Sequence, residues 1–482
     1  MAKLTKKQYK KLSEQLSPEK KSVWDGASPA QRKEIIKLGE RYKEFLDAAK
    51  TERMAVKTIL ARARGKGFKT YKPGIKAKRL AFNFKGKVVA LAVLGRRSPA
   101  QGMRLVGAHI DAPRLDLKMN PLYEDQELVF LKTHYYGGIK KYQWLARPLA
   151  IHGVVCTSAG KSVEVHIGDG DDDPVFTVLD LLPHLSRKVQ ESKKLGEAVE
   201  AERMNLLIGS LPLDSDAGKE RVKLAVLKLL NDKYGIIEPD LISAELELVP
   251  AGRARDVGLD RALVGGYGQD DRSSAFACLE AILSLKDPTM TSVALFLDKE
   301  EIGSEGATGA QSHFLELMTA SLLEAAGDTD NYRQVYGALA ASQMLSADVN
   351  AAYDPDYPEV HEKRNAAFLG HGVCLTKYTG HGGKYGASDA DAEYVAWLRK
   401  VWDAAGVTWQ AAGMGRVDQG GGGTIAKHMA VYGMDIIDVG PSMLAMHSPF
   451  EISSKADMLS SVMAYEAFYQ APPMAGGAGR GL

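Results

Sequence analysis

The stretch VALFLDKEEIGS, residues 293–304, places two adjacent carboxylates directly after an apolar run. The run at 293–297 is typical of a strand buried on both faces of a sheet. Glu300 and Glu301 follow beyond the carboxyl end of that strand, where open α/β sheets bind their ligands. One of two such acids can bind a metal ion while its neighbour accepts a proton. The alternative is a charged, exposed loop, because loops at strand ends commonly carry charge.

A second apolar run, MRLVGAHIDAP at 103–113, also ends in polar side chains. Side chains two residues apart in an extended segment point to the same side. His109 and Asp111 are therefore predicted to lie together, one binding a metal ion and the other orienting it. Taken alone, the pair has a simpler alternative, a surface histidine and its neighbour at a strand end.

Further acids and one histidine complete a set of possible metal ligands. They are Asp270 and Asp271 before a predicted helix at 272–284, Asp348 in SADVN, and His447 in MHSPFE. The alternatives are a helix cap for the two adjacent acids and a buried structural histidine. Together, two histidines and several carboxylates match a site for two metal ions with nitrogen and oxygen ligands. Such a site activates water and polarises a carbonyl, which predicts a hydrolase.

Composition narrows the classes of function. The chain has 482 residues, with 62 Lys and Arg against 60 Asp and Glu, a formal net charge of +2. This balance disfavours a nucleic-acid-binding protein with a basic face. A chain of this length can bury a large core without a structural metal, so a metal cluster is more readily catalytic. The distant cysteines 156, 278 and 374, and the lack of a long apolar run or signal peptide, predict a cytoplasmic protein without a membrane partner.

The pattern of apolar and polar residues changes twice along the chain. Residues 1 to about 60 are predicted to be helical, and apolar strands around a turn follow at 87–94 and 103–108. Alternating patterns predict antiparallel strands within about 115–250, together with a charged helical stretch at 186–232. Helices and strands alternate again from about 265 to a closing helix at 455–470. The sequence therefore predicts an α/β domain interrupted by a different module.

Six motifs occur in a consistent order between about residues 105 and 457: AHIDAPRLD, QDDRSSA, LDKEEIGSEGA, SADVNAAYDP, DQGGGGTIAK and DVGPSMLAMHSPFE. This ordered set resembles the aspartyl-aminopeptidase/aminopeptidase-I family of dinuclear zinc exopeptidases, peptidase family M18. The resemblance implies a mixed-sheet α/β catalytic domain at 1–115 and 250–470. It also implies an inserted β-rich dimerisation domain at 116–249 and a flexible tail at 471–482.

The resemblance also implies a role for each member of the polar set. His109 and Asp348 would bind one metal ion, Glu301 and His447 the other, and Asp270 would bridge both with support from Asp271. Glu300 would be the general base, and Asp111 would orient His109. The implied cofactor is a pair of divalent ions per subunit, zinc above all, with cobalt and manganese as alternatives.

Four residues are predicted to contact substrate. Gly421 and Gly422, in the glycine run 420–423, would bring backbone amides close to it, and the alternative is a tight turn between a strand and a helix. Lys384 would meet an acidic side chain of the substrate. His184, in LPHL, resembles a histidine that relatives supply to the site of a neighbouring subunit, and the alternative is a structural histidine.

The predicted function is a metal-dependent aminopeptidase that removes one residue from peptides with a free N-terminus. The alternatives are a related dinuclear deacylase or dipeptidase, and a non-catalytic, shell-forming scaffold that keeps the fold. Relatives assemble from dimers into tetrahedral dodecamers, so the resemblance implies self-association. Nucleic acid is not an expected partner.

Overall fold

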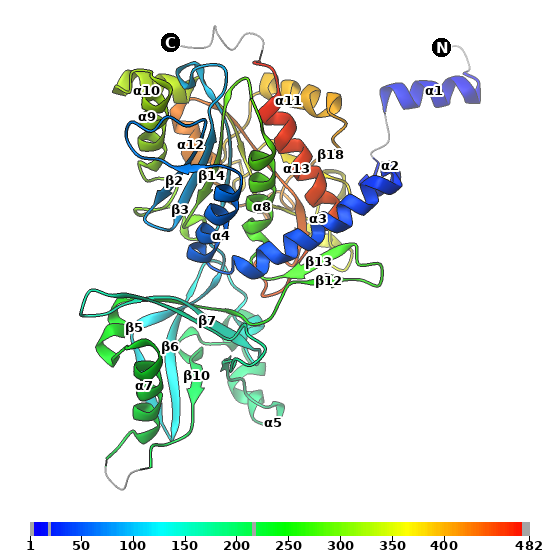
Figure 1. Cartoon of the computed structure of the whole chain (residues 1–482). Coiled ribbons are helices and arrows are strands. Elements are labelled where there is room, and N and C mark those ends of the chain that lie inside the picture. Colours follow the sequence, from blue (N-terminus) through cyan, green and yellow to red (C-terminus); the bar gives the residue numbers. More distant parts are fainter. Residues whose placement is uncertain (1–3, 18–20, 215–217, 475–482) are drawn as a thin grey trace.

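The computed structural model describes residues 4–17, 21–214 and 218–474, which form an upper body and a lower layer (Figure 1). The upper body is built on a nine-stranded mixed sheet, and the lower layer on a separate seven-stranded sheet. Of the predicted flexible tail 471–482, residues 475–482 lie outside the described part of the chain. Among the described residues, no helix is both long enough and apolar enough to cross a membrane.

The nine-stranded sheet organises the upper body. Its strands, in spatial order, are β1 (Lys69–Thr70), β2 (Arg79–Phe84), β3 (Val88–Val93), β14 (Thr291–Leu297), β4 (Met103–His109), β15 (Gln343–Ser346), β19 (Asp435–Gly440), β17 (Val373–Thr376) and β18 (Trp409–Ala411). The adjacent strands β14, β4, β15 and β19 run parallel to one another. Every residue of β14 and β4 is buried, as expected from their apolar runs.

The two strands predicted at 87–94 and 103–108 both form, as β3 and β4, but they do not pair with each other. Strand β14 lies between them, antiparallel to β3 and parallel to β4. The pairing of β14 with β3 and β4, almost two hundred residues earlier, cannot be recognised from local sequence. Each of the three strands is simply an apolar run.

Helices cover both faces of this sheet. The side chains of Val89 and Leu91 join one core with α3 (Pro29–Ala48), α4 (Glu52–Gly65), α8 (Gln269–Ser284), α11 (Ala392–Ala404) and α13 (Lys455–Gln470). Val88 and Ala90 face the other side, toward α9 (Phe314–Ala326), α10 (Tyr332–Ala340) and α12 (Ala426–Met429). The short helices α1 (Lys6–Leu16) and α2 (Val23–Gly26) precede α3. Alternate strand residues point to opposite faces, so each strand serves both cores.

The lower layer, residues 114–250, is antiparallel throughout its described ladders. Its strands, in spatial order, are β8 (Ser162–Ile167), β7 (Leu149–Cys156), β11 (Ala244–Pro250), β5 (Arg114–Asp125), β6 (Leu128–Tyr136), β10 (Leu206–Gly209) and β9 (Thr177–Val178). It has its own core, around the fully buried Trp144 and Leu248, against which side chains of α7 (Arg221–Tyr234) pack. We call these residues the inserted layer, because the upper body continues on either side of them in the sequence.

The predicted charged helical stretch at 186–232 is confirmed only in part. Among its described residues, 186–214 and 218–232, only α7 is a regular helix of more than five residues, and β10 lies within the stretch, paired with β6 and β9. Short helical segments occupy its first part: the end of α5 (Pro183–Ser186), a π-helical turn at Arg187–Glu191 and α6 (Leu195–Ala198). Strand β10 is only four residues long, which is too short for a periodicity to register.

A five-stranded sheet connects distant parts of the upper body. It contains β12 (Arg255–Val257), β13 (Leu263–Gly266), β21 (Glu451–Ser454), β20 (Ser442–Leu444) and β16 (Asn350–Ala351). Residues 267–271 follow β13, residues 445–450 separate β20 from β21, and residues 347–349 precede β16. This small sheet therefore gathers three segments that carry predicted metal ligands.

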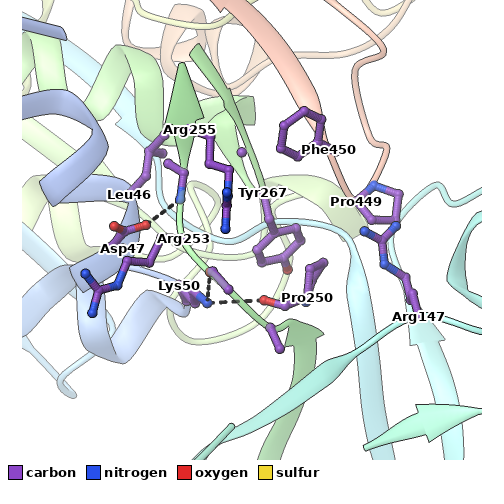
Figure 2. A pocket seen from close by; sticks show the side chains of 14 residues that line it. Leu46, Asp47, Lys50, Arg147, Pro250, Arg253, Arg255, Tyr267, Pro449 and Phe450 are labelled. Carbon is purple, nitrogen blue, oxygen red and sulfur yellow. Dashed lines mark hydrogen bonds between the residues drawn. The ribbon is translucent and has the colours of Figure 1, made fainter. Parts of the chain in front are cut away.

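The inserted layer meets the upper body around a cavity of about 200 Å³ (Figure 2). Lys50, which follows α3, donates to the carbonyl oxygens of Pro250 and Gly252, at 3.2 and 2.7 Å, and pairs with Asp169 of the inserted layer. The cavity is also lined by Tyr267, close to Asp270 in the chain. The junction is thus fixed by hydrogen bonds as well as by the two connecting segments.

Candidate active site

Three neighbouring parallel strands end at the candidate site. Strand β4 ends at His109, β14 is followed by Glu300 and Glu301, and β15 is followed by Asp348. The amide of Ile110 donates to the carbonyl of Leu297, at 2.8 Å, which aligns the first two strand ends. Because parallel strands end at one edge of a sheet, the side chains that follow them converge.

The other two predicted ligands come from the small sheet. Asp270 lies at the start of α8, where it and Asp271 have non-helical dihedral angles. His447 lies between β20 and β21. Glu451 fixes both segments, because its carboxylate accepts the amides of His447 at 2.8 Å and Gln269 at 2.6 Å. Glu451 had no predicted role, although it belongs to the motif MHSPFE, because its contacts are with backbone atoms.

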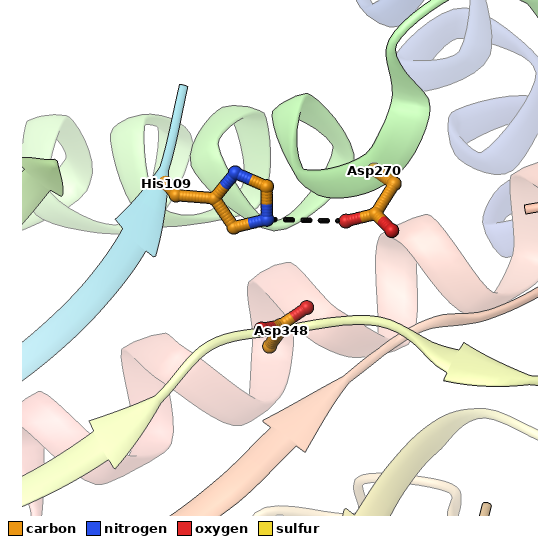
Figure 3. Close-up of side chains that lie close together, drawn as sticks. All are labelled: His109, Asp270 and Asp348. Atoms are coloured by element: carbon orange, nitrogen blue, oxygen red, sulfur yellow. Dashed lines mark hydrogen bonds and ion pairs between the residues drawn. The ribbon is translucent and has the colours of Figure 1, made fainter. Parts of the chain in front are cut away.

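Asp270 is the common member of two groups of ligand atoms. Its Oδ1 lies 3.1 Å from Nε2 of His109, and its Oδ2 lies 3.2 Å from Nε2 of His447. Nitrogen and oxygen atoms of His109, Asp270 and Asp348 fall within 4.8 Å of one another, and so do those of Asp270, Glu301 and His447. Figure 3 shows the first group converging from β4, the start of α8 and the segment after β15.

Both histidines present Nε2 to carboxylates because their Nδ1 atoms have other partners. Nδ1 of His109 lies 3.1 Å from the carbonyl oxygen of Asp111, and Nδ1 of His447 lies 2.9 Å from that of Gly138. An imidazole that donates from Nδ1 keeps a lone pair on Nε2, which is the usual arrangement for a metal ligand. Lone pairs on Nε2 then face carboxylate oxygens, and a cation between them would satisfy both.

The electrostatics of the cluster also favour a cation. Burial and the nearby Asp270 carboxylate raise the pKa of Glu301 well above its ordinary value, and burial and Asp271 do the same for Asp348. Oε1 of Glu301 is buried and has no hydrogen-bond partner among the described residues. Burial lowers the pKa of His447, but Asp270 and Glu301 raise it overall to about 10. The donor set therefore fits divalent metal ions with nitrogen and oxygen ligands.

Asp111 is completely buried and holds four groups of the site. Its Oδ1 lies 3.2 Å from Nδ1 of His109 and accepts the amide of Glu300 at 3.1 Å. Its Oδ2 accepts the amide of Glu301 at 3.2 Å and the hydroxyl of Tyr136 at 2.8 Å. Burial alone would raise the pKa of Asp111. The hydrogen bonds from His109 and Tyr136 lower it by a larger amount, so the net shift is downward.

Comparison with known proteins identifies the family of this chain. The sequence profile described as aminopeptidase I zinc metalloprotease (M18) matches residues 45–469. The chain belongs to the M18 family. A probable M18 family aminopeptidase 1 from Clostridium acetobutylicum is 48% identical over 463 residues, covering 94% of this chain and 98% of the relative.

Solved structures of M18 proteins share the fold. The crystal structure of the Thermotoga maritima M18 aminopeptidase matches with a TM-score of 0.89 and 47% identity, covering 94% of this chain and 99% of that one. The S. cerevisiae mApe1 dodecamer matches with a TM-score of 0.72, covering 89% and 95%, and at 21% identity it is a likeness of fold alone. This chain is accordingly an M18 metal-dependent aminopeptidase with an α/β catalytic fold, and zinc is the metal of its family.

Two predicted substrate contacts of this M18 aminopeptidase lie on another cavity, of about 560 Å³, lined by Lys384 and Gly421. The Lys384 ammonium lies 2.6 Å from Asp389 and 4.0 Å from the ring centre of Tyr378. Gly421 has φ +125°, and a Cβ there would lie 2.0 Å from the carbonyl oxygen of Gly380. The carbonyl of Gly422 accepts the amide of Gly380 at 2.7 Å. The glycine run thus packs two loops together.

His184 lies elsewhere, on α5 of the inserted layer, where it is exposed (Figure 1). Figure 1 places α5 in the lower part of the molecule, and the cluster lies in the upper body at the ends of β4, β14 and β15. The predicted site residues therefore fall into those inside the cluster and those outside it. The structure brings His109, Asp111, Asp270, Glu300, Glu301, Asp348 and His447 together, and it leaves His184 outside the cluster of its own subunit.

Besides Glu451, two residues at the cluster had no predicted role. Tyr136 is the last residue of β6 and Gly138 follows it, so both come from the inserted layer. Their contacts, with Asp111 and His447, join segments far apart in the chain. Nothing in the string THYYGG indicates such a role, because a tyrosine at a strand end and a pair of glycines are ordinary turn features.

Proposed function

We propose that this M18 aminopeptidase binds two zinc ions per subunit, one in each group of ligands that shares Asp270. The observation that supports the pair is that the two oxygens of Asp270 face Nε2 atoms of different histidines, at 3.1 and 3.2 Å. A carboxylate can bridge two cations in this way, and cobalt and manganese suit the same donor atoms.

Glu300 is the general base of the proposed reaction. Bound zinc ions lower the pKa of water and polarise a carbonyl group. The Glu300 carboxylate lies at the edge of the cluster, 3.9 Å from Nε2 of His109, with 16% of its side chain exposed. It takes a proton from the attacking water and passes it to the nitrogen of the departing peptide. Asp111 accepts the backbone amide of Glu300 at 3.1 Å. The role proposed for Asp271 is to support the neighbouring Asp270.

Replacing Glu300 tests this assignment. We expect Glu300→Gln to lower kcat by about 10²–10⁴-fold, because the amide cannot accept the proton, while zinc content stays at the wild-type value. The control is Glu305→Gln, which removes an exposed acid close by in the chain. Steady-state hydrolysis of aminoacyl-chromophore substrates and elemental analysis measure the two quantities. Wild-type kcat in Glu300→Gln would contradict the role of the base.

A free N-terminal amine is the proposed mark of the substrate. A panel of peptides that differ only in N-terminal acetylation tests this requirement. We expect hydrolysis of the free peptides and, at the same enzyme concentration, none of the acetylated ones. Equal cleavage of both would contradict the proposal.

The 560 Å³ cavity is our candidate for contact with the substrate, through Gly421 and the neighbouring Gly422. Lys384 already pairs with Asp389, so we expect it to add little preference for acidic residues. Lys384→Met should therefore change the ratio of kcat/KM values for aspartyl and leucyl substrates by less than about twofold. A selective loss of aspartyl hydrolysis would restore Lys384 as a specificity residue.

We propose that the inserted layer mediates self-association, up to a tetrahedral dodecamer. Its surface exposes Leu185 by 64% and Leu195 by 65%, and α7 exposes Leu224 by 57% and Leu229 by 69%. Large apolar side chains left exposed on one layer are consistent with a surface that a partner covers. Light scattering of Leu229→Glu against wild type tests the role of α7, with a smaller mass expected for the variant.

His184 is proposed to act in the site of a neighbouring subunit. Its exposure between Leu182 and Leu185 supports this, because it lies on the surface proposed for association. We expect His184→Ala to raise KM without changing zinc content. A mixture of this variant with Glu300→Gln should regain some activity, because wild-type sites form between subunits.

The proposed compartment is the cytoplasm. Cys156 is an exposed free thiol, which is typical of a reducing environment. Fractionation of the source cells followed by immunodetection checks the assignment.

A further inference from the structure

We propose that the inserted layer is part of the metal site, and that Tyr136 and Gly138 are its positioning residues. The inference rests on the proposed two-metal function. It adds that the affinity of the upper body for metal depends on three consecutive residues, 136–138, at the top edge of the inserted layer. Gly138 contacts His447 of the second group directly, and Tyr136 reaches His109 of the first group through Asp111.

The hydroxyl of Tyr136 acts through Asp111. It donates to Oδ2 of Asp111 at 2.8 Å, and the same oxygen accepts the amide of Glu301 at 3.2 Å. The other carboxylate oxygen lies 3.2 Å from Nδ1 of His109. A carboxylate held by several donors keeps its orientation, and an oriented carboxylate keeps the imidazole in the metal-binding tautomer. Removing the hydroxyl would take away one of the donors that hold Asp111, and so weaken its hold on the His109 ring.

The ring of Tyr136 is itself fixed within the inserted layer. The guanidinium of Arg114, its partner across β5 and β6, lies 3.8 Å from the ring centre. Arg114 in turn pairs with Asp116 at 2.7 Å, Glu247 at 3.3 Å and Glu52 at 3.7 Å. Glu52 belongs to α4 of the upper body, so this buried network fixes the inserted layer against it. The hydroxyl is therefore held in place before a metal binds.

Gly138 fixes the orientation of the second histidine, His447. Its carbonyl accepts Nδ1 of His447 at 2.9 Å, which leaves Nε2 facing Asp270 and Glu301. The backbone approaches this closely because 137 and 138 carry no side chain. A Cβ at Gly138 would lie 3.2 Å from Nδ1 of His447, and one at Gly137, where φ is +71°, would lie 3.3 Å from Cβ of Glu301.

Replacement of a single hydroxyl tests the proposal. Tyr136→Phe removes the bond to Asp111, and Tyr135→Phe makes the same chemical change one residue earlier, where the side chain is 42% exposed. We expect Tyr136→Phe to weaken zinc binding by about 10–100-fold and Tyr135→Phe to leave it within twofold of wild type. Competition with a chromophoric chelator, using full-length protein stripped of metal, gives the dissociation constants.

Spectroscopy separates positioning from a general loss of fold. The visible absorption of the cobalt-loaded protein reports ligand geometry, so its band shape should change in Tyr136→Phe and remain unchanged in Tyr135→Phe. Wild-type zinc affinity together with a wild-type cobalt spectrum in Tyr136→Phe would overturn the proposal. If Tyr136→Phe does not fold, Gly137→Ala replaces it, and the same affinity and spectral criteria apply, because its Cβ would press on Glu301.

A separate variant distinguishes failure of this inference from failure of the proposed function. Asp270→Asn removes the proposed bridging ligand. If it binds two zinc ions as tightly as wild type, the two-metal function itself fails. If it loses metal and Tyr136→Phe does not, the ligands are correct and only the contribution of the inserted layer is wrong.

Discussion

At the scale of single residues, Asp270 connects the two halves of the metal site. Each of its oxygens faces one histidine, and each histidine has its Nδ1 close to a carbonyl oxygen. Burial raises the pKa of Asp270, but the interactions with His109 and His447 lower it by more, so the net shift is downward and the carboxylate stays ionised. An ionised, buried, two-sided carboxylate suits two cations better than one.

We therefore predict that Asp270→Asn binds at most one zinc ion per subunit. The amide offers a single oxygen and no negative charge, so it cannot bridge two cations. Elemental analysis after dialysis against limiting free zinc measures the stoichiometry. Asp172→Asn, which changes an exposed acid in the inserted layer, should keep the wild-type zinc content. If Asp270→Asn still bound two zinc ions per subunit, the bridging role of Asp270 would be contradicted.

Most residues of the metal cluster could be predicted from the sequence. The residues that hold them in position could not. His109, Glu301 and Asp348 follow apolar strands, which is a signal that a single sequence carries. Tyr136 and Gly138 act through one hydroxyl and one carbonyl, and neither group is distinguishable from others of its type in the sequence. The outward placement of His184 is likewise a property of the folded inserted layer.

At the scale of elements, the ends of strands are fixed by close backbone contacts. Gly440 ends β19, and a Cβ there would lie 2.0 Å from the carbonyl oxygen of Asp348. The amide of Ala347 donates to the carbonyl of Gly107 at 2.6 Å, which holds the other side of the same turn. The position of Asp348 thus depends on a glycine in a neighbouring strand.

Gly440→Ala should consequently destabilise the upper body by about 1–3 kcal/mol, because the methyl group must displace the backbone at Asp348. Zinc affinity should fall with it. The matched control is Gly337→Ala in α10, where a Cβ meets nothing within 4 Å and should stabilise the helix by about 0.5–1 kcal/mol. Chemical unfolding of zinc-loaded protein compares the three chains. Equal unfolding midpoints for both variants would argue against the close approach.

Helix α13 contains a buried acid with an unusual titration. Asp457, in its first turn, accepts the amides of Gly370 at 2.8 Å and Gly372 at 2.7 Å. Burial raises its pKa to about 7, although these two bonds lower it. Between the pKa of the unfolded chain, about 3.9, and about 7, the folded protein binds a proton that the unfolded chain has lost. This group therefore makes stability fall as pH rises through that window.

We expect Asp457→Asn to flatten the dependence of stability on pH between about 4 and 7, by about 1.4 kcal/mol per pH unit at most. Asparagine does not titrate, so its contribution is constant. Urea unfolding at pH 5, 6 and 7 with a fixed excess of zinc measures the slope, and Asp287→Asn provides an exposed-acid control. Parallel slopes for wild type and Asp457→Asn would show that the acid does not titrate in this range.

The elements themselves were predictable to different degrees. The closing helix predicted at 455–470 forms as α13, and the apolar runs form β3, β14 and β4. The order of strands was not predictable, because β14 pairs between β3 and β4 through contacts remote in sequence. The helical prediction for 186–232 was correct only in part, since its charge suggested a helix and the short β10 gave no opposing signal.

At the scale of the whole molecule, a formal net charge of +2 conceals a local excess of acid. Asp270, Asp271, Glu300, Glu301 and Asp348 surround two histidines at one edge of the central sheet. Folding brings these carboxylates together in a buried site, where repulsion opposes it. Bound cations offset that repulsion, so metal and fold are coupled.

Removal of metal should accordingly lower the unfolding temperature of the upper body. A ligand at a concentration of 100 Kd contributes about 2.7 kcal/mol to stability, and two sites contribute more. Differential scanning calorimetry with and without a chelator measures the shift, and added zinc should reverse it. Identical transitions in both conditions would contradict the coupling of metal and fold.

The path of the chain between the two layers restricts how the protein can be re-engineered. Strand β4 ends at the metal ligand His109, and β5 of the lower layer begins at Arg114, so the chain crosses into the lower layer beside the metal site. It returns to the upper body after Pro250, ahead of the small-sheet strands that lead to Asp270. Exchanging the lower layer between relatives is therefore a graft into the catalytic centre. A transplanted layer that lacks a tyrosine and a glycine turn at its upper rim would yield a folded hybrid with a poorly organised metal site.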